Sequence, residues 1–219
     1  MSKSFEEWYK KHGLEIYWYQ YRSIMGFDPE KPESFEEIMY WKRVKKMRDK
    51  CSNSNDPHYA ITNAPSFDKQ SHLKKWWEDL NRLDKEKYLI HVWFGKMNGL
   101  MYGLDWWIPF FEDVGFITNC DTYRPHEPIT LYRGTEPYFQ QSMSWTTNLD
   151  MARTFADSTS LMGDKNVYKT TVKPESILAI FKGNAVDRNG EMLREHGLEY
   201  VINHQDLKYD DIVEINSSK

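Results

Sequence analysis

The sequence predicts an α+β fold, in which a helical region over residues 1–128 packs on a mostly antiparallel sheet over residues 129–219. Helix-capping motifs and apolar residues at helical spacing fill the first part. Short strand-like segments bounded by turn residues fill the second part. The 219 residues suffice for one ample core, so we expect the two regions to form one compact unit.

Two identical SFEE tetrapeptides, at Ser4–Glu7 and Ser34–Glu37, mark helix starts. In this capping box the Ser and the Glu three residues later satisfy backbone N–H groups that a helix start leaves unpaired. After the second box, Ile38, Trp41 and Val44 recur every three residues and form one apolar stripe. The pattern predicts an amphipathic helix from about residue 34.

Two further helices are predicted over residues 68–82 and 86–103, and a short packed element over residues 106–111. The helix over 86–103 carries apolar residues on nearly every face, which predicts that it is buried. Residues 51–65 are rich in Asn, Ser and Pro, which predicts a loop or linker.

After Pro128 the pattern becomes that of strands. Residues 129–133 predict a strand that ends at Gly134, and residues 143–146 predict a second one. A helix follows, with Thr147 and Asp150 as its cap signal and Phe155 on its apolar face, where we expect it in the core. The remaining predicted strands are 167–172, 177–181, 200–202 and 212–215.

Composition and charge exclude several classes of protein. A net charge of −4 gives no general attraction to nucleic acid or to an anionic membrane. The two cysteines, Cys51 and Cys120, form no paired motif, which fits free thiols in a reducing compartment. The N-terminus lacks a continuous apolar segment, and Asp105 and Pro109 interrupt the most apolar stretch. We therefore expect a cytoplasmic protein with no membrane partner.

Common cofactor and metal motifs are absent from the sequence. The seven histidines never fall at metal-ligand spacing, and there is no phosphate-binding glycine loop. Neither cysteine lies in a catalytic signature. The sequence predicts no metal site.

A basic run on the helix that begins near residue 34 has two interpretations. Its cations are Lys42, Arg43, Lys45, Lys46, Arg48 and Lys50. Opposite an apolar stripe they indicate a solvated outer face. Alternatively they contact an acidic partner or nucleic acid, with Trp76–Trp77 and Trp106–Trp107 stacking on bases. The abundance of aromatic residues favours core positions for these tryptophans.

Three segments of the second half combine into a functional pattern. They are LYRG at Leu131–Gly134, the block SMSWTTNLDMARTFA at Ser142–Ala156, and GLEYVI at Gly197–Ile202. Taken singly, such residues are ordinary, since an Arg at a strand end commonly pairs with a surface charge and a Ser before a helix commonly caps it. Their order and their strand and helix context give the pattern its specificity.

In this order the segments resemble the Arg–Ser–Glu class of ADP-ribosyltransferases, in particular compact ADP-ribosyltransferase-like proteins of phages and bacteria. The resemblance covers residues 129–215 and implies a split antiparallel sheet, NAD⁺ as co-substrate and no metal. It further implies a transferase that acts as a phage or bacterial effector in a host or bacterial cytosol. The implied catalytic residues are Glu199, Arg133 and Ser144. The implied NAD⁺-binding residues are Arg133, Gly134, Ser144, Trp145 and Thr146.

Each implied role has a chemical reason. Arg133 offers a rigid fork of donors to phosphate or ribose oxygens, and Gly134 permits close backbone approach to the nicotinamide carboxamide. Ser144 orients the catalytic carboxylate. Glu199 stabilises the positive charge that develops on the ribose as the nicotinamide bond breaks.

The remaining two residues line the same site. Thr146 supports the wall of the cleft, and Trp145 packs on the nicotinamide or ribose.

The sequence does not identify the acceptor of the ADP-ribose group. Arginine-modifying members of the family carry a Glu two residues before the catalytic one, and here that position is Gly197. Glu195 and Glu191 lie nearby, in a polar segment from Lys182 to Leu198 that we expect to be the acceptor-reading loop. The acceptor is a protein, a nucleic acid, a small molecule or water, and water would make the chain an NAD glycohydrolase. A non-catalytic module that binds a nucleotide or a partner on the same fold is the rival interpretation.

Overall fold

The computed structural model describes residue 11 and residues 34–95, 102–157, 166–186 and 192–215. Contacts divide the chain into two compact units, Met1–Met97 and Asn98–Lys219. The division between these units falls after residue 97, whereas the sequence predicts a division near residue 128. The segment from residue 102 to residue 128, predicted to be part of the helical region, belongs with the sheet.

The helical unit contains α3 (Phe35–Ser52), α4 (Pro57–Asn63), α5 (Lys69–Trp76), the 3₁₀ turn η1 (Trp77–Asp79) and α6 (Arg82–Gly95). The helix start predicted at Ser34 is confirmed, because the Glu37 N–H donates to Ser34 Oγ at 3.2 Å. The apolar stripe of α3 is buried at Trp41 and Val44. The first SFEE box lies outside the described residues.

The loop predicted over residues 51–65 is wrong in part, because α4 lies within it. Asp56 caps this helix, its Oδ1 accepting from the His58 N–H at 2.9 Å. Pro57 stands in the first turn, where its missing N–H costs nothing. The Asp56–Pro57 pair, whose residue types are common in loops, here begins a helix.

The remaining helix predictions hold with shifted ends. The helix predicted over 68–82 is α5 followed by η1. The helix predicted over 86–103 is α6, which begins earlier because Asn81 Oδ1 accepts from the Asp84 N–H at 3.0 Å. Its predicted end is wrong, since residues 102 and 103 are not helical and Gly103 has a φ of 77°. Residues 96–101 lie outside the described part.

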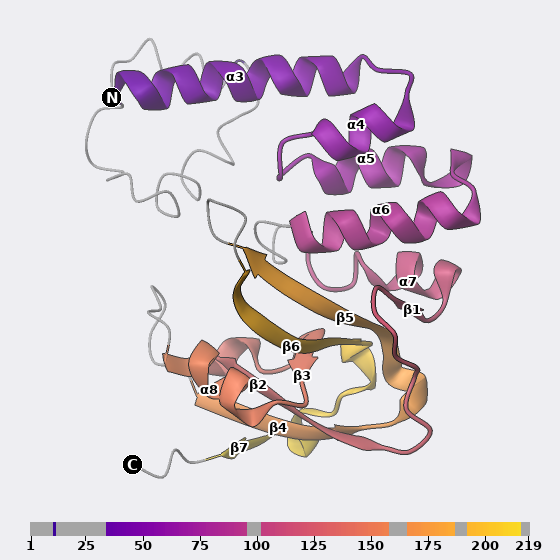
Figure 1. The fold of residues 1–219 in the computed structure, drawn as a ribbon, viewed down its shortest axis with the longest axis vertical. Coiled ribbons are helices and arrows are strands. Elements are labelled where there is room, and N and C mark those ends of the chain that lie inside the picture. Colours follow the sequence, from indigo (N-terminus) through magenta and orange to yellow (C-terminus); the bar gives the residue numbers. More distant parts are fainter. Residues whose placement is uncertain (1–10, 12–33, 96–101, 158–165, 187–191, 216–219) are drawn as a thin grey trace. The chain divides into compact units, whose positions relative to one another are not determined.

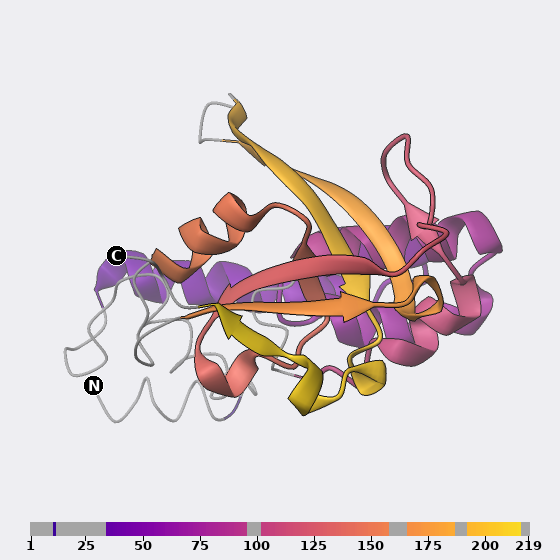
Figure 2. The same ribbon diagram turned by 90° about the horizontal axis from the view of Figure 1, so that it is seen from below.

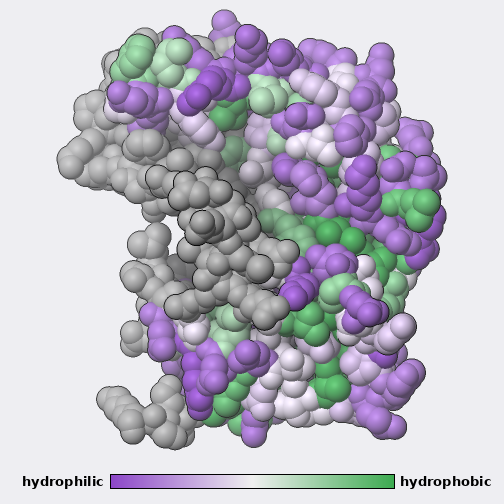
Figure 3. Space-filling model, viewed as in Figure 1, coloured by the Kyte–Doolittle hydropathy of each residue, from purple (hydrophilic) through white to green (hydrophobic). Residues whose placement is uncertain are grey.

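The basic run on α3 divides between inner and outer positions. Arg48 turns inward and donates to both carboxylate oxygens of the buried Asp68, from Nε at 2.9 Å and from Nη2 at 2.8 Å. Lys45 pairs with Asp49 on the same helix. The other four cations are exposed, namely Lys42, Arg43, Lys46 and Lys50. Hydrophilic residues cover much of the surface over α3 (Figure 3).

The paired tryptophans are largely core residues. Trp77 is 6% exposed and Trp107 is 0% exposed. Trp76 and Trp106 are partly buried. Four of the six cations of the basic run are exposed, so its main character is that of a solvated outer face.

Acid should weaken the helical unit through His72. Burial beside Arg48 and Lys75 lowers the pKa of His72, against the opposing charge of Asp68. Because the unfolded chain then binds more protons than the folded chain, the free energy of unfolding falls as the pH drops below the ordinary histidine pKa of about 6.5. We expect the urea midpoint to fall between about pH 7.5 and about pH 5 in the wild type, and to fall less in His72→Gln. Equal losses in the two proteins would contradict this.

The second unit is built on a sheet of seven strands within the described residues (Figure 1). Its order is β1-β5-β6-β3-β2-β4-β7, and every neighbouring pair is antiparallel except β1 with β5. The strands are β1 (Ile117–Thr118), β2 (Ile129–Thr135), β3 (Ser144–Thr146), β4 (Asn166–Val172), β5 (Ile177–Val186), β6 (Met192–Ile202) and β7 (Val213–Ile215). The predicted α+β class with a mostly antiparallel sheet is confirmed.

Helical segments complete this unit. They are α7 (Ile108–Val114), α8 (Leu149–Asp157) and the 3₁₀ turns η2 (Pro137–Phe139), η3 (Pro174–Ser176), η4 (His204–Asp206) and η5 (Tyr209–Asp211). The short element predicted over residues 106–111 corresponds to α7, which contacts β5. In the described residues, no helix is both long and apolar enough to cross a membrane.

The predicted acceptor loop is mostly a hairpin. Strands β5 and β6 stay paired from Lys182 opposite Leu198 to Val186 opposite Met192. Figure 2 shows the two strands running together beyond the rest of the sheet. The prediction of a loop from Lys182 to Leu198 is therefore wrong for most of its length, and residues 187–191 lie outside the described part.

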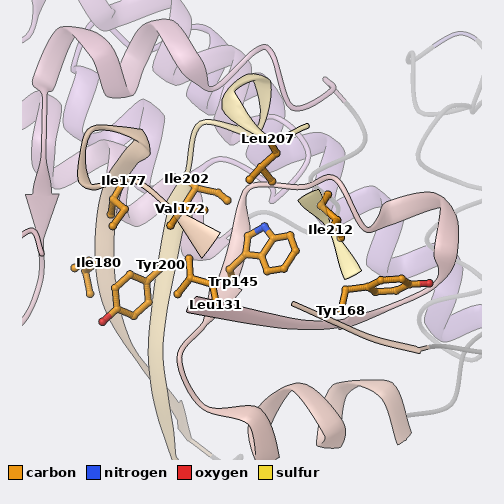
Figure 4. Packing of buried hydrophobic residues seen from close by; sticks show 10 residues of the cluster. All are labelled: Leu131, Trp145, Tyr168, Val172, Ile177, Ile180, Tyr200, Ile202, Leu207 and Ile212. Carbon is orange, nitrogen blue, oxygen red and sulfur yellow. The ribbon is translucent and has the colours of Figure 1, made fainter. Parts of the chain in front are cut away.

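The two faces of the sheet are covered differently. One face carries the apolar core shown in Figure 4, whose residues are Leu131, Trp145, Tyr168, Val172, Ile177, Ile180, Tyr200, Ile202, Leu207 and Ile212. Because side chains alternate along a strand, Leu131 and Gly134 lie on opposite faces of β2. Helix α8 packs on the Gly134 face through the buried Ala152. Phe155 of this helix is 52% exposed, so its predicted core position is wrong.

Candidate active site

Three neighbouring strands, β2, β3 and β6, bring the three predicted catalytic residues together. Arg133 Nη1 donates to the backbone carbonyl oxygen of Ser144 at 2.6 Å. Ser144 Oγ in turn donates to Glu199 Oε1 at 2.6 Å. We call this hydrogen-bonded set the Arg133–Ser144–Glu199 row.

Strand register explains why Ser144 meets Glu199. On the β3–β6 pair, Thr146 lies opposite Glu199 and Ser144 lies opposite Val201. Ser144 is two residues from Thr146, so its side chain points to the same face as Glu199. The two side chains are therefore diagonal neighbours, a spacing that side chains can bridge.

Arg133 lies next to the position at which β2 and β3 stop pairing. These two strands pair at only one position, Tyr132 with Thr146. Beyond this pair, the Arg133 guanidinium connects β2 to β3 by its hydrogen bond to the Ser144 carbonyl oxygen. Its Nε donates to the Phe139 carbonyl oxygen at 3.1 Å. One side chain thereby ties β2 to β3 and to the turn η2.

The charge on Arg133 is retained at neutral pH. Burial lowers the pKa of Arg133 to about 10, while the negative charges of Glu199 and Glu136 act in the opposite direction. A cation therefore stands close to the Glu199 carboxylate. The pair is joined through Ser144, which makes the position of both charges depend on that residue.

Thr146 sets the turn from β3 into α8. It is 8% exposed, and its Oγ1 accepts from the Asn148 N–H at 3.1 Å. Asn148 Oδ1 then accepts from the Met151 N–H at 3.0 Å, as the cap of α8. The predicted cap signal at Thr147 and Asp150 is therefore one residue off. Thr146 braces the site from this side through the start of α8.

Two predicted NAD⁺-binding residues, Trp145 and Gly134, take part in packing. Trp145 is 2% exposed in the apolar core, where its Nε1 donates to the Ser142 carbonyl oxygen at 2.6 Å. Alternation along β3 turns this indole away from the face of Ser144. Gly134 does permit a close backbone approach, but the approaching backbone is that of α8. A Cβ atom on Gly134 would lie 1.9 Å from the Ala152 carbonyl oxygen.

Gly197 lies two residues before Glu199 on β6 and faces the same side. A Cβ atom there would lie 3.5 Å from Asn148 Cβ and 3.7 Å from Thr146 Oγ1, which are ordinary contacts. The position therefore has room for a methyl group. Asn148 was given no role from the sequence, although an Asn just before an amphipathic helix is a recognisable cap signal.

Two other carboxylates were considered from the sequence, Glu195 and Glu191. Glu195 lies on β6 opposite Asn184, four residues from Glu199, a separation of about 13 Å along a strand. Glu191 lies outside the described residues.

The side-chain groups of the Arg133–Ser144–Glu199 row are one guanidinium, one hydroxyl and one carboxylate. Within the part of the chain that the structure describes, no three His, Cys, Asp or Glu side chains gather as metal ligands would. Comparison of the chain with protein families, with curated proteins and with solved structures gives no match, and the candidate site is therefore defined by the geometry of Arg133, Ser144 and Glu199.

Proposed function

We propose that the chain is an NAD⁺-dependent ADP-ribosyltransferase, which cleaves the nicotinamide–ribose bond and transfers ADP-ribose to an acceptor. The observation that carries the proposal is the 2.6 Å hydrogen bond from Ser144 Oγ to Glu199 Oε1, beside the cation of Arg133. The single pair that joins β2 to β3 fits the split sheet that the sequence resemblance implies.

The row supplies what this reaction requires. As the bond to nicotinamide breaks, positive charge develops on the ribose, and a carboxylate held in advance stabilises that charge. Ser144 holds one oxygen of Glu199, so the carboxylate does not have to reorient during the reaction. Two of the five N–H donors of Arg133 serve backbone carbonyls, and the others are suited to phosphate or ribose oxygens.

Gly197 favours an acceptor other than the arginine guanidinium. The position beside Glu199 carries no second carboxylate, and its nearest polar neighbours, Thr146 and Asn148, are uncharged. A neutral nucleophile needs no such carboxylate to hold a cationic group. NAD glycohydrolase activity, with water as acceptor, is therefore the second candidate.

The proposal is tested by incubating the full-length chain with NAD⁺ and measuring nicotinamide release. Labelled NAD⁺ in a whole-cell lysate then identifies the acceptor, because label appears in protein, in nucleic acid or as free ADP-ribose. NAD⁺ binding without nicotinamide release would identify a non-catalytic binding module. A chain that neither binds NAD⁺ nor releases nicotinamide would refute the proposal.

Ser144→Ala tests whether the serine positions the carboxylate. Loss of the hydroxyl leaves Glu199 without the bond that orients Oε1, and misplacing a catalytic group lowers turnover by about tenfold to a hundredfold. We expect kcat for nicotinamide release to fall by this factor while KM for NAD⁺ changes little. Ser144→Thr keeps the hydroxyl and should restore part of kcat. Ser142→Ala is the control, and wild-type kcat in Ser144→Ala would refute the role.

A further inference from the structure

Among the described residues of the helical unit, Lys69 is hydrogen-bonded to an imidazole. Lys69 Nζ on α5 lies 2.9 Å from His91 Nε2 on α6, and both side chains are partly buried. Two cations cannot share such a short contact, so one of the two groups is neutral.

The surroundings of His91 decide which group is neutral. His91 is also hydrogen-bonded to the backbone of Thr62, an interaction that favours the protonated ring. Since Nε2 faces Lys69, the remaining nitrogen, Nδ1, donates to the Thr62 carbonyl oxygen. Burial and the charge of Lys69 nevertheless lower the pKa of His91. His91 is therefore a neutral ring whose Nε2 lone pair points at the amine.

Burial and the contact with His91 both bear on the reactivity of the Lys69 amine. Burial lowers its pKa, which increases the share of uncharged amine at a given pH. Lys45 on α3 shows the contrast, because its ammonium is paired with Asp49. The amine lies against Gly95, where a Cβ atom would lie 3.1 Å from Lys69 Nζ, so a side chain at this position would crowd it.

We propose that Lys69 is a site of covalent modification by activated acyl compounds, specifically thioesters, with His91 as the proton acceptor. The Lys69 nitrogen attacks the thioester carbonyl, so that a C–N bond forms, the C–S bond breaks and the thiolate leaves. One proton of the amine passes to His91 Nε2 and then to the thiolate. The resulting amide keeps one N–H, which can donate to His91 Nε2. This proposal involves the helical unit alone and is independent of the proposed NAD⁺ chemistry.

The test is to treat the folded, full-length chain with a limiting amount of a simple acetyl thioester and to quantify acetylation of each lysine by peptide mass spectrometry. Lys74, an exposed lysine on the same helix, is the internal reference. We expect Lys69 to react at least about threefold faster than Lys74, with a pH–rate curve that rises at lower pH. A rate at or below that of Lys74 would overturn the proposal.

His91→Gln tests the proton acceptor. Glutamine keeps a hydrogen-bonding side chain but takes up no proton, so the rate at Lys69 should fall towards that of Lys74. His126→Gln, at an exposed histidine of the other unit, is the matched control. An unchanged Lys69 rate in a folded His91→Gln protein would refute the role of His91. If circular dichroism shows that this variant is unfolded, the wild-type pH–rate curve decides the question.

Discussion

Glu199→Gln is expected to release nicotinamide from NAD⁺ about a hundredfold to a thousandfold more slowly than the wild-type chain. Glutamine has the size of glutamate, and its amide oxygen can accept the Ser144 hydroxyl as Oε1 does. The substitution therefore removes the negative charge while it keeps the shape of the row. Since the charge acts on the ribose cation only as the bond breaks, the loss should appear in kcat and leave NAD⁺ affinity nearly unchanged.

The measurement pairs nicotinamide release with NAD⁺ binding by calorimetry. Glu175→Gln, an exposed glutamate on η3, is the matched control and should behave as the wild type. A Glu199→Gln protein that releases nicotinamide at the wild-type rate would remove Glu199 from the chemistry. An equal loss of binding and turnover would instead indicate that Glu199 serves to hold NAD⁺.

The candidate site could be predicted because its residues lie in short segments whose local structure is plain from the sequence. Arg133, Ser144 and Glu199 each lie on or beside a strand predicted from the sequence, and these three strands need only become neighbours to form the row. The order β6-β3-β2 makes them neighbours. In the structure β2 continues past Arg133 to Thr135. What the sequence did not reveal is the way each side chain points. Trp145 lies between two residues that face α8 and the site, and strand alternation turns it into the core.

The fold predictions failed where local composition and tertiary context disagree. Polar residues between Lys182 and Leu198 indicate a loop, yet backbone pairing between β5 and β6 carries the strands through most of them. Asn, Ser and Pro residues between 51 and 65 also indicate a loop, and a capped helix starts there at Pro57. In both cases the prediction failed because backbone hydrogen bonds, which composition does not reveal, determine the local structure.

Gly134 links the packing of this unit to its candidate site. The residue follows Arg133 on β2, and its face is closed by α8. The start of α8 is tied through Asn148 to Thr146, which pairs with Glu199. A change that displaces α8 therefore also disturbs the strand that orients the carboxylate.

Gly134→Ala is expected to lower the free energy of unfolding by about 3 kcal/mol or more. The new Cβ atom would lie 1.9 Å from the Ala152 carbonyl oxygen and 2.6 Å from the Ala156 nitrogen. Both are backbone atoms of α8, so no side-chain rotation relieves the overlap and the helix has to move. Urea unfolding followed by far-UV circular dichroism measures the loss.

Gly197→Ala is the matched control, at a glycine on the same sheet. Neither glycine has a positive φ, so neither substitution places an alanine in the left-handed region. The two variants are compared by the space around the new methyl group. At Gly197 the nearest atom would be 3.5 Å away, and the unfolding free energy should stay within about 1 kcal/mol of the wild type. Equal stability of the two variants would show that α8 does not pack on Gly134. A loss confined to Gly134→Ala, with nicotinamide release reduced in the protein that remains folded, would establish that α8 holds the Thr146 side of the site in place.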